Sequence, residues 1–425
     1  MYKAGVSRWL IALLFLMLAS PAVAQPVPVA PRIQTPAEAL AQDAGEYATL
    51  FGVSQTEAER RLRALADSVA TTDSIEAAYR DRIAGVSIEH KPALRILIYL
   101  TGDVPVPGRT LVAGGMTVPI VFRTGAKASR DRVIWAMTYH QAAIRVALPT
   151  PPAMGLDPRT GELVVIVPTA TAAATGAEAI RARLEGIAGV PVRLRVLDQV
   201  DVNLSAAGGS RVEGINPADG KRYLCTTAFA VTDGQRYGVA TAAHCVDDLS
   251  YIDPQRVATP LSYVGQWGWG YQDVQINAAP TPLAGLFYAD TARTVERPVT
   301  DQRSRDSTRA GDFVCHRGET TGYSCAVVDL TDFAPAGDLC GGPCLPTWVT
   351  VAGPTCKGGD SGSPVFIGTT ALGIVKGATY RGGACIFYFY MSTDYIPQPW
   401  KLVTEAPVGA ATPQRYRPTP PPDRQ

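Results

Sequence analysis

A serine between glycines and a histidine upstream of it are the residues of this chain that could do chemistry. The serine lies in Cys356-Lys357-Gly358-Gly359-Asp360-Ser361-Gly362-Ser363-Pro364, and the histidine lies in Thr241-Ala242-Ala243-His244-Cys245. A serine hydroxyl is a poor nucleophile at neutral pH unless an adjacent imidazole takes its proton. The flanking glycines allow a sharp turn, so the amides of Gly359 and Ser361 can both face one developing oxyanion. The pattern predicts Ser361 as nucleophile and His244 as general base.

The histidine needs an acidic partner that fixes its tautomer and stabilises its charged form. Asp273 is the preferred candidate, because it opens the alternating run Val274-Gln275-Ile276 and can point inward from the start of a strand. Asp247 and Asp248 are too close in sequence to reach back to the imidazole without a tight turn. Asp253 and Asp290 are weaker alternatives. For the serine motif taken alone, a Gly/Ser loop without chemistry is the other interpretation.

The start of the chain has the pattern of a secretion signal. Residues 1–24 hold basic Lys3 and Arg8, an apolar run from Trp9 to Leu18, and a small-residue cleavage site at Ala22-Val23-Ala24. The apolar run is shorter than the about twenty residues that a membrane span needs, so an uncleaved anchor is the less favoured alternative. We expect a secreted protein, extracellular or periplasmic, without a stable membrane anchor.

The cysteines divide the chain. All 8 lie between Cys225 and Cys385, and the even number fits a paired disulfide framework in a secreted domain. With 39 basic and 38 acidic residues, nothing in the charge points to a nucleic-acid partner. A chain of 425 residues with 46% hydrophobic residues can support two or three ordinary cores.

The pattern of apolar and turn residues changes at about residue 205. Before about residue 205 the pattern is mixed α+β, with helical periodicity from residue 37 to about 100 and a capping box at Ser54–Glu57. His90 and His140 occur singly there, and we expect each to be structural or solvated. Further elements are expected there as strands at 94–99, 161–168 and 190–197 and helices at 133–147 and 177–187. After residue 205, frequent turn residues and lost helical periodicity predict an all-β domain. Residues 401–425 are Pro- and Arg-rich, which predicts a disordered tail.

At this point the residues resemble a family. His244 in T-A-A-H-C, Asp273, and Ser361 in G-D-S-G-S-P have the order and motifs of chymotrypsin-fold serine proteases. The closer resemblance is to secreted bacterial members such as α-lytic protease and the streptogrisins, whose C-R-S-G-x-T-T-G-x-x-C segment is similar to residues 315–325. Residues 155–165 resemble a stretch of their pro-regions. The resemblance is strong over about 205–400 and partial over 40–200.

The resemblance implies an all-β catalytic domain, a chymotrypsin-like double antiparallel β-barrel, preceded by an α+β pro-region. The expected organisation is a signal peptide at 1–24, a pro-region at 25–204, a protease domain at 205–400 and a tail at 401–425. The pro-region would assist folding, block the cleft and be removed by a cut within residues 202–207. A permanent N-terminal domain with its own binding role is the alternative.

The cysteine pairing also comes from the resemblance. It implies the disulfides Cys225–Cys245, Cys315–Cys325 and Cys356–Cys385. Cys340 and Cys344 remain, and we expect them to bridge to each other. A metal or redox C-x-x-x-C site is the alternative, but no histidine or further free cysteine is near enough to complete a ligand set. We expect neither a metal nor another cofactor.

The substrate pocket is assigned by family position to Pro354, Thr355 and Lys357 on one side and to Lys376, Gly377 and Ala378 on the other. It holds no carboxylate, so a preference for Arg or Lys is not expected. Gly377 and Ala378 leave room for medium or large apolar side chains, whereas either lysine, turned inward, could favour acidic groups. Lys376 matches a family serine that supports the aspartate. Either the alignment slips by one or two residues, or that hydrogen bond is absent, or the lysine competes with the histidine.

The sequence therefore predicts a serine endopeptidase made as a zymogen. Its partners would be protein or peptide substrates and its own pro-region, with no nucleic acid. The alternative from another class is a catalytically silent, protease-like binding protein. Such proteins usually lack a triad residue or the oxyanion glycine, and here all of them are in place.

Overall fold

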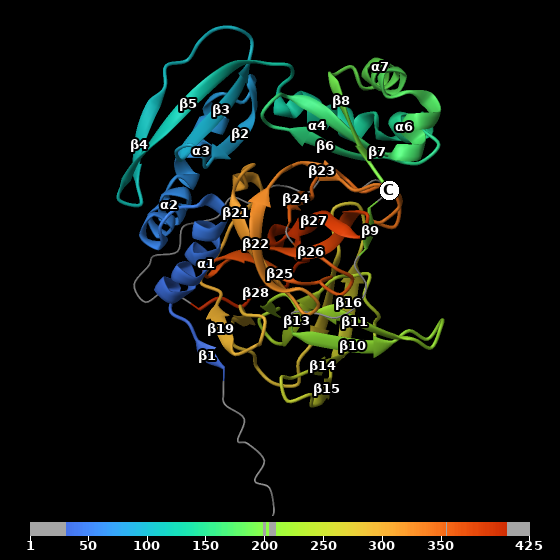
Figure 1. Cartoon of the computed structure of the whole chain (residues 1–425). Helices are drawn as coiled ribbons and strands as arrows, with labels where there is room; N and C mark the ends of the chain where they lie inside the picture. The colour runs from blue at the N-terminus through green and yellow to red at the C-terminus, as the bar shows by residue number, and fades with distance from the viewer. Residues whose placement is uncertain (1–30, 199–200, 204–209, 354, 406–425) are drawn as a thin grey trace, which may run out of the picture. The chain divides into compact units, whose positions relative to one another are not determined.

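The computed structural model describes residues 31–198, 201–203, 210–353 and 355–405 (Figure 1). The expected signal peptide, most of the linker after residue 198, Pro354 and residues 406–425 of the expected tail lie outside the described residues. The tail was expected to be disordered from residue 401, but Lys401–Leu402 form a strand that pairs with Val231–Thr232. In the part that is described, no helix is both long enough and apolar enough to cross a membrane.

After the short strand β1 (Arg32–Ile33) come three helices: α1 (Pro36–Phe51), α2 (Gln55–Asp67) and α3 (Val69–Ala78). Helix α1 begins with a full capping box, in which Thr35 and Glu38 satisfy each other's backbone amides. At α2 only half of the expected box forms. Ser54 Oγ accepts from the Glu57 amide at 3.2 Å, but the Glu57 carboxylate accepts from Arg61.

The helical expectation for residues 37 to about 100 was too long. The helices end at Ala78, and a sheet follows in the order β2-β3-β5-β4. Its strands are β2 (Ile83–Glu89), β3 (Arg95–Thr101), β4 (Arg109–Ala113) and β5 (Met116–Ala126). Strand β2 is buried on both faces over Ile83–Ile88, so its residues do not show the alternation that identifies a half-exposed strand.

A second α/β unit follows. Its helices are α4 (Arg130–Tyr139), α5 (Gln141–Val146), α6 (Thr169–Thr175) and α7 (Ala177–Ala188), and its strands are β6 (Ala153–Asp157), β7 (Glu162–Pro168) and β8 (Val192–Leu197). The single helix expected at 133–147 is interrupted at His140, which ends α4. The sheet order is β23-β6-β7-β8, and β23 (Phe333–Ala334) comes from the β-rich part of the chain.

The first half of the β-rich part consists of short antiparallel strands in separately bonded sheets. One has the order β11-β10-β14-β15 and another the order β16-β17-β13-β12-β28. Their strands are β10 (Arg211–Ile215), β11 (Arg222–Thr226), β12 (Ala230–Thr232), β13 (Tyr237–Thr241), β14 (Ser250–Ile252), β15 (Ala258–Pro260), β16 (Ser262–Trp267), β17 (Val274–Ala278) and β28 (Lys401–Leu402).

The second half closes into a barrel. Its strands run β26-β25-β21-β22-β24-β27, and the pairing of β27 with β26 closes the ring. They are β21 (Phe313–Gly318), β22 (Gly322–Val328), β24 (Val349–Ala352), β25 (Pro364–Ile367), β26 (Thr370–Arg381) and β27 (Ala384–Ser392). Apolar side chains such as Val314, Val351 and Leu372 fill its core. The expected fold class, an all-β part preceded by α+β structure, is confirmed.

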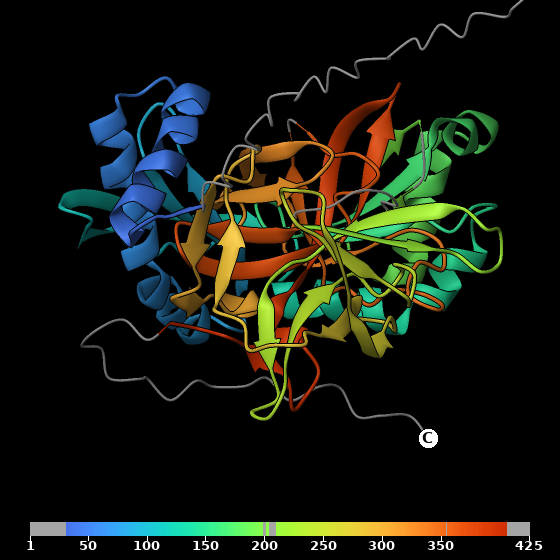
Figure 2. The same cartoon turned by 90° about the horizontal axis from the view of Figure 1, so that it is seen from below.

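The α+β part is joined to the β-rich part by strand pairing as well as by packing. Strand β1 (Arg32–Ile33) pairs in parallel with β19 (Val295–Pro298), which itself pairs with β18 (Leu286–Tyr288). Strand β9 (Val202–Asn203) pairs with β26. Viewed from below, the α1–α3 helices and the β6–β8 sheet lie on opposite sides of the barrel strands (Figure 2).

Candidate active site

Three loops bring the predicted triad residues together. His244 follows the end of β13, and Asp273 immediately precedes β17. These two strands are antiparallel neighbours with Thr241 opposite Gln275, so both loops lie at the same end of the sheet. Ser361 lies in the turn that precedes β25 of the barrel. The site therefore lies where the two halves of the β-rich part meet.

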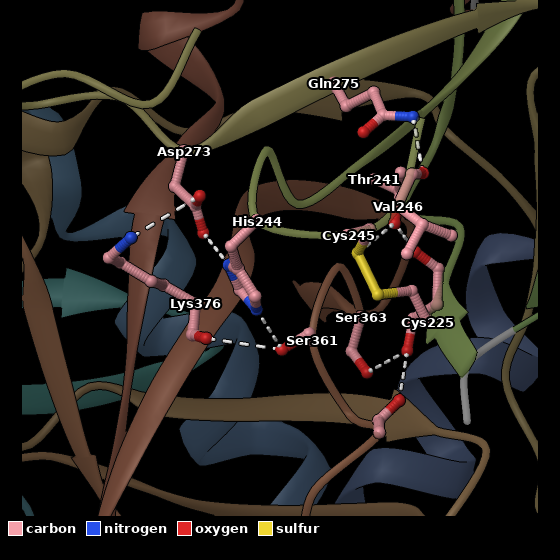
Figure 3. Close-up of a disulfide and its surroundings, with 12 residues drawn as sticks. Cys225, Thr241, His244, Cys245, Val246, Asp273, Gln275, Ser361, Ser363 and Lys376 are labelled. Atoms are coloured by element: carbon pink, nitrogen blue, oxygen red, sulfur yellow. Dashed lines mark hydrogen bonds and ion pairs between the residues drawn. A yellow bond between two sulfur atoms is a disulfide. The ribbon is translucent and has the colours of Figure 1, made fainter. Parts of the chain in front are cut away.

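The three side chains form a continuous hydrogen-bonded row (Figure 3). His244 Nδ1 lies 2.9 Å from Asp273 Oδ2, and His244 Nε2 lies 2.7 Å from Ser361 Oγ. Asp273 and Ser361 are buried, whereas the His244 side chain keeps 14% of its surface exposed. This arrangement lets the imidazole accept the serine proton on one side while the carboxylate fixes its orientation on the other.

Lys376 lies on the other side of Asp273. Its Nζ is 3.4 Å from Asp273 Oδ1 and 5.2 Å from the centre of the Trp348 ring, and its side chain is buried. Burial on its own would raise the pKa of Asp273, but the charges of His244 and Lys376 outweigh it and hold that pKa below its ordinary value. Burial also lowers the pKa of Lys376, against the attraction of Asp273.

This position of Lys376 differs from the expected pocket wall. The ammonium turns to the carboxylate and not to the pocket, because Asp273 and the face of Trp348 offer a buried cation its compensation. Only the backbone of Lys376 faces the serine, with its carbonyl oxygen 3.4 Å from Ser361 Oγ. Of the three alternatives that the sequence left open for Lys376, this geometry agrees with the one in which the lysine competes with His244 for the Asp273 carboxylate.

The serine turn depends on its glycines. Gly362 has φ +83°, and a Cβ there would lie 2.1 Å from the Thr226 carbonyl oxygen. Gly359 has φ +108°, again a conformation that side chains rarely adopt. The turn is held from the side by Thr226, whose Oγ1 donates to the Gly359 carbonyl at 3.0 Å. Asp360 closes it by accepting from the Lys357 amide and from Thr321 Oγ1.

The amides of the serine turn are divided in their use. Those of Asp360, Gly362 and Ser363 donate to main-chain carbonyls of Lys357, Val375 and Asp360. Within the residues that the structure describes, the amides of Gly359 and Ser361 have no protein acceptor. They are the pair that the sequence assigned to a developing oxyanion.

The other candidate aspartates have other surroundings. Asp290 accepts from the Thr294 and Val295 amides, and Asp253 accepts from the Val257 amide. Asp247 and Asp248 are exposed. Each of the first two closes a local turn, which leaves Asp273 as the carboxylate on the imidazole.

The remaining pocket candidates differ in burial. Gly377 and Ala378 are buried on β26, Thr355 is half-buried, and Lys357 is exposed. Pro354 lies outside the described residues. Thr355 Oγ1 donates to Ser324 Oγ at 2.8 Å.

Sequence reasoning missed His316. This residue is fully buried on β21. Its Nδ1 lies 3.5 Å from Ser324 Oγ, and its ring centre lies 4.7 Å from that of Tyr388, with the two rings tilted by 57°. Burial lowers its pKa, which favours the neutral imidazole. The available signal was its departure from the C-R-S-G segment of the family, because it replaces the arginine there.

The described end of the linker occupies the edge of the site. Asn203 pairs with Gly377 and Val202 pairs with Ala378, in antiparallel register. Just before them, the buried Asp201 accepts from the Ala336 amide and from Thr379 Oγ1. The sequence indicated an exposed linker here and gave no sign of this strand.

The cysteines form four disulfides in the structure: Cys225–Cys245, Cys315–Cys325, Cys340–Cys344 and Cys356–Cys385. Three of these are the pairs that the resemblance implied, and Cys340–Cys344 is the pair expected from the two remaining cysteines. Asp43 lies near Cys315 and Cys325, but both sulfurs are bonded to each other and cannot act as thiolate ligands. His90 is structural, since it lies between the Tyr47 hydroxyl and the Gly311 carbonyl.

No protein-family model matches the chain. It is similar to Streptogrisin-C of Streptomyces griseus, with 28% identity over 167 residues that cover 36% of this chain and 32% of that protein. The chain thus matches only about a third of the length of this curated relative.

Similar solved structures have low TM-scores. One is Thermobifida fusca Protease A, which is 21% identical to this chain, with a TM-score of 0.36. The match covers 47% of this chain and 98% of that one. The Nocardiopsis protease NAPase has 20% identity, 44% and 91% coverage and a TM-score of 0.33. In part of its sequence the chain is thus similar to a bacterial streptogrisin, and this match agrees with the chymotrypsin-like resemblance of the motifs.

Proposed function

We propose that this protein is a secreted serine endopeptidase, made as a zymogen, that cleaves peptide bonds through Ser361, His244 and Asp273. One observation carries the proposal: the hydrogen-bonded row from Asp273 through His244 to Ser361, beside two amides available to an oxyanion. Protein or peptide substrates follow from the protease family.

The reaction is acyl transfer in two halves. Ser361 Oγ attacks the peptide carbonyl carbon while His244 Nε2 takes its proton, and the Gly359 and Ser361 amides donate to the oxyanion. The tetrahedral species collapses when His244 gives the proton to the leaving amine. Water then attacks the acyl-enzyme, with His244 again as base, and restores Ser361. Asp273 stabilises the imidazolium in both halves.

A fluorophosphonate probe tests the nucleophile. We expect it to label Ser361 in the processed wild-type protein, with no labelling in Ser361→Ala. Asp273→Asn should lose several powers of ten in turnover. Asp290→Asn, at an aspartate that closes a local turn, is the matched control and should keep its turnover. Folded protein that neither reacts with the probe nor cleaves peptides would instead support the silent binding protein.

The zymogen proposal rests on β9. A peptide can bind a protease cleft by adding a strand to an edge of the sheet, and β9 does this on β26 with residues of the same chain. Strand β9 would therefore exclude other peptides until residues 25–204 leave. A peptide that continues the β9 register puts its next residue opposite Lys376, next to Ser361. In this chain the next residue is Leu204.

We therefore expect the cut at the Leu204–Ser205 bond, within the range 202–207 that composition indicated. An apolar residue before the cut also agrees with the proposed preference for apolar side chains, since no carboxylate was found among the pocket candidates. Mass spectrometry of secreted protein should find Ser205 as the new N-terminus in wild type and not in Ser361→Ala. Peptide libraries cut mainly after Arg or Lys would contradict the pocket assignment.

A further inference from the structure

The most informative contact outside the triad is that of Asp201. Its side chain is 5% exposed, although it belongs to a linker, and it meets two donors that both come from the β-rich part. The Ala336 amide donates to Oδ2 at 2.7 Å, and Thr379 Oγ1 donates to Oδ1. Both donors are buried. The carboxyl group therefore fills a small polar site.

The position of this site along the cleft is fixed by strand pairing. Thr379 follows Ala378 on β26, and Asp201 comes just before Val202, the first residue of β9. The side-chain contact therefore continues the antiparallel register by one residue. A substrate held in the same register presents the corresponding side chain here, three residues before the residue that faces Lys376.

We propose that Thr379 Oγ1 and the Ala336 amide form a carboxyl-binding subsite that selects peptide substrates with aspartate at the position of Asp201. This inference rests on the proposed peptidase function, and it names a substrate class for the same cleft. Asp201 of the linker is then the first side chain that binds in this subsite.

The chemistry of the donors explains the selectivity. A backbone amide cannot turn away, so it lacks a protein acceptor whenever the substrate carries an apolar side chain there, and an unpaired buried donor is costly. The threonine hydroxyl can supply its proton to the second carboxyl oxygen. A long side chain such as lysine would bring a third donor to a site that already holds two. The length of aspartate matches the site because Asp201 itself occupies it.

Hydrogen exchange on the uncleaved Ser361→Ala protein tests the subsite without catalysis. We expect Asp201→Ala and Thr379→Val each to speed exchange of the β9 amides at least tenfold, because each removes one side of the contact. Thr379→Ser keeps the hydroxyl and should keep the protection. Thr370→Val, at the other end of β26, is the matched control and should leave β9 unchanged.

Cleavage of matched peptides tests the selectivity. One peptide covers residues 199–208, and the second carries Ala in place of Asp201. We expect kcat/KM for the first peptide to be about ten- to a hundredfold higher with the processed parent protein. The ratio should fall severalfold with Thr379→Val, whose site keeps only the Ala336 amide, and remain high with Thr379→Ser and Thr370→Val.

The two experiments separate the possible failures. Equal exchange of β9 in the parent protein, Asp201→Ala and Thr379→Val overturns the subsite, and so does an unchanged peptide ratio in Thr379→Val. If no peptide is cleaved at all, the peptidase function fails, while hydrogen exchange still decides whether the carboxyl site holds the strand.

Discussion

At the scale of single residues, Lys376 sets this site apart. A carboxylate beside an imidazole acts through its negative charge, which stabilises the imidazolium. Here the Asp273 carboxylate also lies beside a buried ammonium, so part of its field is compensated before His244 takes a proton. The charge of Lys376 therefore weakens the support that Asp273 gives to the imidazolium.

Replacing Lys376 by methionine tests this effect. The change keeps the length of the side chain and removes its charge, so Asp273 should stabilise the imidazolium of the transition state more strongly. At a fixed neutral pH, kcat should rise by up to about tenfold. Lys401→Met, at an exposed lysine of β28, is the control. A kcat that stays unchanged or falls would contradict the role of Lys376.

At the scale of elements, β9 makes the occupied cleft sensitive to pH. Burial raises the pKa of Asp201 from 3.8 to about 6, against the two hydrogen bonds it accepts, whose donors are uncharged. A linker or peptide whose Asp201 carboxyl group has a higher pKa in the bound state than in the free state binds best when that group is protonated in both states. Binding of the linker is therefore strongest below about pH 4. It weakens as pH rises from about 4 to 6 and is constant above that.

A peptide of residues 199–204, added to the processed protein, should show this dependence. We expect its inhibition constant to rise by up to about a hundredfold from pH 4 to pH 7. The same peptide with Asn in place of Asp201 has no carboxyl group to titrate, so the ratio of the two constants isolates this side chain. A ratio that does not change with pH would contradict the prediction.

Helix α1 is docked by a buried charge pair. Asp43 accepts from Arg297 at 2.8 Å, from the Tyr323 hydroxyl and from the Gly368 amide, and both charged side chains are fully buried. Asp43→Asn would leave the Arg297 charge without its counter-ion, which costs about 3–5 kcal/mol. Denaturant unfolding of the uncleaved Ser361→Ala protein should show this loss. The exposed Glu46→Gln on the same helix is the control, and an equally small effect of both would be the contrary result.

How far the sequence predicts these elements depends on whether their pattern is local. The helical periodicity over α2 and the strand expected at 161–168 depend on neighbouring residues, and both agree with expectation. His244, Asp273 and Ser361 are found because their motifs are local too. Strand β2 was hidden by burial on both faces. Strand β9 and Asp201 could not be found, because only pairing with β26, far along the chain, gives them structure.

At the scale of the whole molecule, several arginines of the β-rich part take partners from the α+β part. Arg309 donates to Ser68 Oγ and to the Leu65 carbonyl, and Arg297 pairs with Asp43. A barrel closed by non-local pairing folds slowly, and a second part that satisfies its buried charges would lower the barrier. This supports the proposed role of residues 25–204 as a folding assistant.

Refolding of residues 205–400 with oxidised cysteines tests that role. We expect little activity without residues 25–204 and recovery when that segment is added in trans. A segment that carries Asp43→Asn should rescue less than the wild-type segment, and one that carries Glu46→Gln should rescue equally well. Equal recovery with and without any segment would favour a permanent N-terminal domain with another role.

The contact between Asp201 and Thr379 also constrains how this chain can evolve. The linker and the subsite are encoded in one gene, so a substitution that changes what the subsite reads also changes whether the precursor can close its own cleft. The two positions should therefore be replaced together in related chains, with loss of the hydroxyl accompanied by an apolar residue in the linker. A change in the substrate side chain that the proposed subsite accepts would therefore require a change at position 201 of the linker.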